Sequence, residues 1–109
     1  MERDYIMNNE QRSFQLILHS GNARSLAHEA LQLIKEEKKE EANNKMQEAK
    51  SELLEAQKLH AQMLRDMANS EEVKVDLLLI HAEDHVSGSQ NCLDMATEVI
   101  AIYERFGDK

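Results

Sequence analysis

The sequence predicts an all-α protein, an antiparallel up-down-up three-helix bundle that self-associates through its third helix. The helices are predicted because the 109 residues include no proline and only three glycines, and because apolar residues recur at alternating spacings of four and three. Self-association is predicted because the last helix carries two apolar seams, and one bundle covers only one of them. We expect a single domain over residues 1–109.

Composition excludes several classes of protein. The net charge of −8 argues against binding to nucleic acid or to an anionic membrane surface, since both need clustered Lys and Arg. No apolar run approaches the roughly 20 residues of a membrane-spanning helix. The polar segment 1–13 does not resemble a signal peptide. The single cysteine, Cys92, excludes an internal disulfide and predicts a reducing, cytoplasmic location.

The first helix is expected over about residues 10–36. Most residues of its apolar seam are small, so another helix can approach closely. Gly21 costs helix stability, and a close backbone contact would compensate for it. The charged run 35–41 is expected to be a short exposed connection. The seam comprises Leu16, Ser20, Ala23, Ala27, Ala30 and Ile34.

The second helix is expected over about residues 40–68. Its methionines are interpreted as core residues that fill gaps, and His60 as a histidine at the core or its boundary. Ser70 is the expected capping residue of the third helix, within a turn over residues 69–72. The seam of the second helix comprises Ala42, Met46, Ala49, Leu53, Ala56, His60, Met63 and Met67.

The third helix is expected over about residues 73–106, and its two seams differ by about 100° around the axis. One seam is expected to face the bundle and the other a copy of the same helix. The first comprises Val75, Leu79, Ala82, Val86, Ser89, Leu93, Ala96, Ile100 and Tyr103. The second comprises Leu78, His81, His85, Gly88, Cys92, Met95, Val99, Ile102 and Phe106.

A cluster of ionisable residues in the third helix is the main candidate site. The apolar run 77–80 predicts a turn buried on all sides, yet His81, Glu83, Asp84 and His85 follow it at once. Buried charge is costly unless it is paired, bound to a metal or used in chemistry. The conflict indicates a functional site at a contact between subunits.

Spacing alone leaves three interpretations of the cluster open. A polar layer would fix the register of the helices. A metal site would use the H-x-x-D-H pattern of His81, Asp84 and His85 to bind zinc or iron. A nucleophilic imidazole, oriented by its neighbours, would accept a phosphoryl group. A helical scaffold with no chemistry is a further alternative.

Two stretches resemble one known family. Residues 19–31 (HSGNARSLAHEAL) and 77–85 (LLLIHAEDH) are similar to the enzyme IIA component of the lactose/cellobiose-type phosphoenolpyruvate-dependent sugar phosphotransferase system, and the resemblance extends from about Glu10 to Tyr103. It implies a cytoplasmic homotrimer of three-helix subunits. His81 would take a phosphoryl group from the carrier HPr and pass it to a cysteine of the cognate IIB protein. The membrane component IIC would be involved only indirectly.

The resemblance also implies roles for the neighbours of His81. Asp84 from each subunit would bind one ion, typically Mg²⁺, at the three-fold axis, and His85 would support the site. Two features depart from the family pattern. Glu83 stands where glutamine is usual, and a carboxylate would repel a phosphoryl group. The small and polar stretch 86–91 replaces large apolar residues and predicts a looser helix. A degenerate or regulatory homologue therefore remains an alternative, and Cys92 is not expected to take part in transfer.

Overall fold

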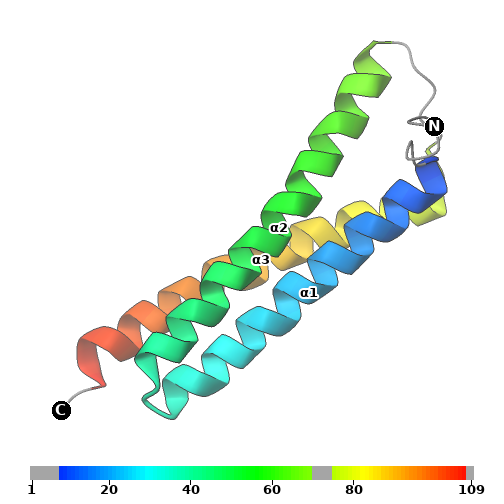
Figure 1. Cartoon of the computed structure of the whole chain (residues 1–109). Coiled ribbons are helices and arrows are strands. Elements are labelled where there is room, and N and C mark those ends of the chain that lie inside the picture. The colour runs from blue at the N-terminus through cyan, green and yellow to red at the C-terminus, as the bar shows by residue number, and fades with distance from the viewer. Residues whose placement is uncertain (1–7, 70–74, 108–109) are drawn as a thin grey trace, which may run out of the picture.

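A computed structural model of the chain describes residues 8–69 and 75–107, which contain three helices and no strand. The helices are α1 (Asn9–Lys35), α2 (Lys39–Ala68) and α3 (Leu77–Phe106). α1 and α3 run in the same direction and α2 runs antiparallel to both, so the predicted up-down-up bundle is confirmed (Figure 1). α2 diverges from α1 and α3 toward its C-terminal end (Figure 1). The body measures 57 × 27 × 20 Å.

The helix ends follow local chemistry. Asn8 caps α1 in a capping box: its side chain accepts from the backbone N–H of Gln11, and the Gln11 side chain accepts from the N–H of Asn8. The charged connection between α1 and α2 is confirmed but is only residues 36–38, where Glu37 adopts a left-handed φ of 64°.

The start of α3 differs from the prediction. The helix begins at Leu77 and its cap is Asp76, whose carboxylate accepts from the backbone N–H of Leu79 at 2.9 Å. A carboxylate caps as well as a hydroxyl and also favours the positive end of the helix dipole, so Asp76 sets the boundary. Ser70, the predicted cap, lies outside the described residues, as does Val73.

The core follows the predicted seams closely. All six seam residues of α1 are buried, as are six of the eight in α2. His60 is only partly buried, and Met67 is 43% exposed because α2 has diverged from its neighbours there. The buried residues of α3 all belong to its first predicted seam: Leu79, Ala82, Ser89, Leu93, Ala96 and Ile100.

Small side chains bring α1 and α3 close together. The buried hydroxyl of Ser89 donates to the backbone carbonyl of Ser20 at 2.7 Å, which fixes the two helices at this point. The close contact predicted for Gly21 is wrong, since a Cβ there would meet no atom within 4 Å. None of the described helices is long and apolar enough to span a bilayer.

Candidate functional site

The outer face of α3 carries a stripe of exposed apolar side chains. Leu77, Met95 and Ile102 are 81%, 64% and 57% exposed. They share one side of the helix with Asp84, because the spacings of 7, 11 and 7 residues are close to whole numbers of turns. Met95 and Ile102 belong to the second predicted seam, as does the exposed Phe106. The partly exposed members of that seam are Leu78, His85, Gly88, Cys92 and Val99.

The burial expected for the turn 77–80 is not found within one chain. Leu79 is buried, Leu78 is partly buried, and Leu77 and Ile80 face outward with 81% and 57% exposure. Large apolar side chains exposed in a row on one helix are typical of a surface that another protein covers. Asp84, an exposed carboxylate, lies in the middle of this surface.

His81 and His85 form a close pair beside the stripe. Their Nε2 atoms lie 3.1 Å apart, and the rings meet edge to face with centroids 4.5 Å apart and an interplanar angle of 89°. A hydrogen bond at this distance requires one ring to donate its Nε2 proton and the other to offer its Nε2 lone pair. His81 is exposed and His85 partly buried, so the pair is accessible to a reagent from outside.

Asp84 does not join this pair. In residues 8–69 and 75–107, its carboxylate has no hydrogen bond or ion pair, and no three His, Cys, Asp or Glu side chains are grouped to hold a metal ion. The interpretation of His81, Asp84 and His85 as a transition-metal site within one chain is therefore not supported. Mg²⁺ is commonly held by one or two carboxylates with water completing its shell, so the exposed carboxylate of Asp84 could supply one ligand but does not by itself make a dedicated site.

Glu83 is turned toward α2 and away from the histidine pair. Its Oε2 lies 3.3 Å from Nε2 of His60, although the geometry is not that of a hydrogen bond. Residue 83 is two positions from residue 81, about 200° around the helix. The expected repulsion between Glu83 and a group on His81 is thus weakened, because the carboxylate faces His60 on another side of α3.

The helix beside the site is not loosened. α3 continues as regular helix through the stretch 86–91, where Ser89 is buried and bonded to α1. Ala82, which follows His81, is also fully buried, in a cluster with Leu16 and Leu79. The expectation of a looser helix is wrong because the small residues of this stretch allow close packing of α1, and this packing holds α3 in place.

Arg24 of α1 is a residue of this region to which the sequence analysis gave no role. A Cβ placed on Gly88 would lie 2.9 Å from its Nη2 and 3.7 Å from its Cζ, so the guanidinium lies directly over the α3 backbone at Gly88. Spacing places Arg24 one turn after the seam residue Ser20 and Gly88 one turn after His85, but it does not indicate that the two meet.

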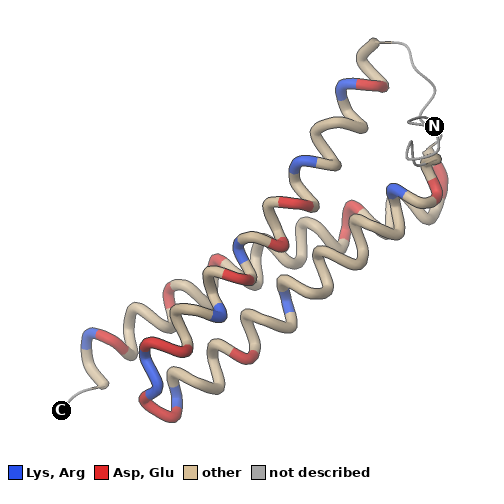
Figure 2. Tube along the Cα trace, viewed as in Figure 1, with Lys and Arg blue, Asp and Glu red and all other residues tan. Residues whose placement is uncertain are grey.

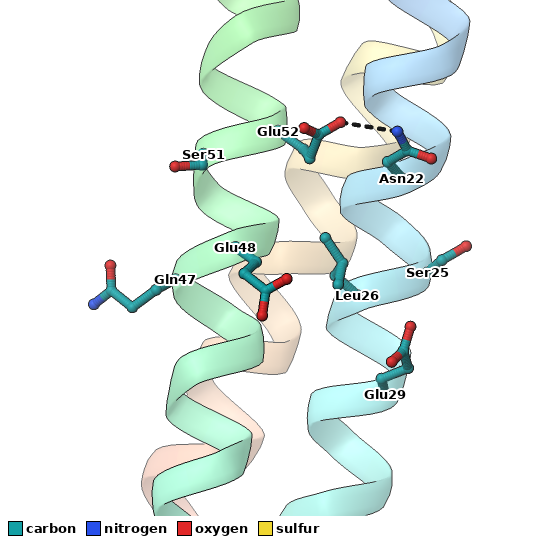
Figure 3. A pocket seen from close by; sticks show the side chains of 8 residues that line it. All are labelled: Asn22, Ser25, Leu26, Glu29, Gln47, Glu48, Ser51 and Glu52. Atoms are coloured by element: carbon teal, nitrogen blue, oxygen red, sulfur yellow. Dashed lines mark hydrogen bonds between the residues drawn. The ribbon is translucent and has the colours of Figure 1, made fainter.

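A polar groove lies elsewhere, between α1 and α2 (Figure 3). It has a volume of about 640 Å³. Glu52 accepts a hydrogen bond there from Nδ2 of Asn22 at 2.9 Å, and its Oε1 lies 3.0 Å from His19 Nδ1; these partners lower the pKa of its carboxyl group. The groove is lined by Asn22, Ser25, Leu26, Glu29, Gln47, Glu48, Ser51 and Glu52, and it does not include the histidine pair.

Comparison with known proteins identifies the family. Residues 11–104 match the model of the lactose/cellobiose-specific IIA subunit of the phosphotransferase system. The chain belongs to this family of IIA subunits. The match covers the histidine pair, Asp84 and Arg24 together.

Similar IIA subunits agree with this assignment over nearly their whole length. The chain is 39% identical to the lichenan-specific phosphotransferase enzyme IIA component of Bacillus subtilis, covering 92% of this chain and 91% of that protein. The crystal structure of the cellobiose-specific enzyme IIA from Bacillus anthracis superposes with a TM-score of 0.89 at 38% identity, over 98% of both chains. A solution structure of a chitobiose IIA in complex with HPr superposes with a TM-score of 0.81 at 29% identity, covering 94% of this chain and 99% of that chain. The chain is therefore a sugar-specific IIA component of this transport system.

Proposed function

We propose that this IIA subunit is a cytoplasmic phosphocarrier in which His81 accepts a phosphoryl group from phospho-HPr. The group then passes to a cysteine of a cognate IIB protein, and the membrane component IIC is served only through IIB. The observation that carries the proposal is the accessible imidazole pair, with its two Nε2 atoms 3.1 Å apart. The solved complex of a related chitobiose IIA with HPr supports the choice of donor.

The chemistry requires one neutral ring nitrogen with a free lone pair. That nitrogen attacks phosphorus, the bond from phosphorus to the donor breaks, and its electron pair stays with the donor. We assign the shared Nε2 proton to His85, which donates it to the Nε2 lone pair of His81 and keeps that nitrogen deprotonated. This hydrogen bond opens as the phosphoryl donor docks, and the lone pair of His81 is then free to attack phosphorus. When Nε2 of His81 carries the phosphoryl group, the same N–H of His85 is placed to donate to a phosphoryl oxygen.

We further propose that three copies associate through the exposed stripe of α3. The stripe is apolar apart from its polar centre, so association removes Leu77, Met95 and Ile102 from water. The same association brings three Asp84 carboxylates together, and these repel one another unless a cation neutralises them. Carboxylate oxygens suit Mg²⁺, so Asp84 is the residue that would hold this ion between subunits.

Phosphorylation with phosphoenolpyruvate, enzyme I and HPr tests the carrier role. The wild type is expected to gain acid-labile label, and His81→Gln to gain none while keeping its helical circular dichroism. His28→Gln is the matched control, because His28 is exposed on α1 and lies outside the pair. Label on His81→Gln would refute the assignment. No label on folded wild type would instead favour a degenerate or regulatory homologue.

Sedimentation equilibrium tests the assembly and the metal. The wild type is expected at three times the monomer mass. Asp84→Leu should stay folded, because its side chain is exposed, and should lose the Mg²⁺ that the wild type retains after dialysis. A monomeric wild type would refute association through α3, and undiminished Mg²⁺ in Asp84→Leu would refute the assigned ligand.

A further inference from the structure

α3 provides no positive charge near its own histidines. Between Leu77 and Glu104 the helix contains no Lys or Arg, as Figure 2 shows along its length. The charged neighbours of the histidine pair in sequence are the carboxylates of Glu83 and Asp84. A phosphoryl group adds a charge of about −1.5 to −2 at neutral pH. Any cation that balances this group must therefore come from another helix or another molecule.

Arg24 of α1 is in a position to supply that cation. Its guanidinium lies over Gly88, three residues after His85, and residue 88 is only about 20° around the helix from residue 81. At 1.5 Å per residue, Gly88 is about 10.5 Å along the axis from His81 and about 4.5 Å from His85, from which it also lies about 60° around the helix. Nε2 of His81 lies 3.1 Å from Nε2 of His85, so the two rings present one site to a cation that approaches along this face of α3.

The guanidinium of Arg24 is also available. Within residues 8–69 and 75–107 it makes no hydrogen bond or ion pair, whereas Arg12 of the same helix pairs with Asp66 at 2.6 Å. The side chain is exposed, yet its base is held in place because Ser20, one turn earlier, accepts the buried hydrogen bond from Ser89. A guanidinium that is held at its base and has no partner among the described residues can offer its planar set of donors to an anion.

The cations of α2 are on the wrong side of α3. α2 meets α3 through Glu83, which faces His60, and through Gln90, which accepts from Gln57. Residue 83 lies about 200° around the helix from residue 81, so α2 approaches the side opposite the histidine pair. Among the residues that the structure describes, Arg24 of α1 is thus the cationic side chain beside the face of α3 that carries the histidine pair.

We propose that Arg24 binds the phosphoryl group carried by the His81–His85 pair, with Gly88 as the gap in side chains that admits its guanidinium. The planar guanidinium donates two parallel hydrogen bonds to phosphoryl oxygens, which an ammonium group cannot do with the same geometry. The identity of the anion rests on the proposed carrier function. The position of Arg24 over α3 does not depend on it.

The equilibrium of phosphoryl transfer between HPr and this chain tests the proposal. Arg24→Gln is expected to move the equilibrium toward phospho-HPr by about 10- to 150-fold, the range for losing a hydrogen bond to a charged group. Arg24→Lys should recover only part of this loss. Arg65→Gln is the matched control, because Arg65 is an exposed arginine of α2 bonded to Gln62, and it should change the equilibrium less than 2-fold.

A structural role would leave a different signature. If Arg24 only packed on Gly88, Arg24→Gln would lower the melting temperature and leave the transfer equilibrium unchanged, which would overturn the proposal. Gly88→Ala is a second test, because the added Cβ would lie 2.9 Å from Nη2 of Arg24 and would displace the guanidinium. It should stay folded and shift the equilibrium in the same direction as Arg24→Gln.

NMR of the arginine side chains separates this proposal from the carrier function. The wild type is phosphorylated by phospho-HPr or, if HPr does not react, by phosphoramidate, whose P–N bond breaks with release of ammonia. On either route, the Arg24 guanidinium ¹⁵N–¹H signals are expected to shift and those of Arg65 to stay. If phosphoramidate labels the chain, phospho-HPr does not, and the Arg24 signals shift, then HPr is refuted as the donor while the role of Arg24 in binding the phosphoryl group stands. Label without an Arg24 shift would overturn it.

Discussion

Leu16→Ala would test whether the α1–α3 packing supports the histidine turn. Leu16 is fully buried, and its cluster includes Ala82, the residue next to His81, and Met63 of α2. Truncation removes three carbon atoms and leaves a cavity that the surrounding helices fill only in part. The perturbation therefore acts directly beneath the candidate site without changing any charged group.

The structure sets the expected magnitude. Leu→Ala changes at buried sites cost roughly 2–5 kcal/mol, and the cost falls where neighbours can move into the space. Met63 is a flexible neighbour near the end where α2 diverges, which favours the lower half of the range. We expect a loss of about 3 kcal/mol, which for a domain of this size lowers the melting temperature by roughly 12–24 °C.

Urea unfolding followed by circular dichroism measures this loss. The midpoint should fall while the m-value stays constant, since the surface exposed on unfolding is nearly the same. Proteins are compared at equal concentration, because association couples stability to concentration. Leu18→Ala is the matched control: Leu18 is on the same helix but 51% exposed, and should cost well under about 1 kcal/mol. Equal costs for the two variants would refute the inferred core.

Two further predictions concern polar groups. The pKa of Glu52 is lowered in the folded chain, first by the hydrogen bond from Asn22 and then by His19, from a reference value of 4.5. A lowered carboxyl pKa stabilises the fold above the unfolded pKa. The stability difference between wild type and Glu52→Gln should thus be full at pH 7 and shrink as the pH falls below about 4.5; a difference independent of pH would contradict this. Asp76→Ala should cost about 1 kcal/mol in urea unfolding by removing the cap on Leu79, whereas Asp76→Asn should retain most of it; equal losses would argue against the cap.

Helical periodicity was sufficient to predict most of the core. All six residues of the predicted α1 seam are buried because α1 meets both neighbours along one side, and the same spacing continues to Ser13, which is also buried but was not predicted. The prediction that Met67 of the α2 seam is buried was wrong, since a helix that diverges from its neighbours exposes residues that share a face with buried ones. The predicted start of α3 was wrong because Ser70 and Asp76 are both residue types that cap helices well, and the sequence alone does not choose between them.

The sequence by itself determined the all-α class, the three helices and the clustering of His81, Asp84 and His85, because these depend on composition and on spacing within one helix. Only the tertiary structure decided which helix each side chain meets: Glu83 faces His60 of α2, and Arg24 of α1 crosses over Gly88. Periodicity gives the angular position of a residue around the axis of its own helix. The partner across the gap depends on how closely and in what direction two helices cross, which spacing along one chain does not contain.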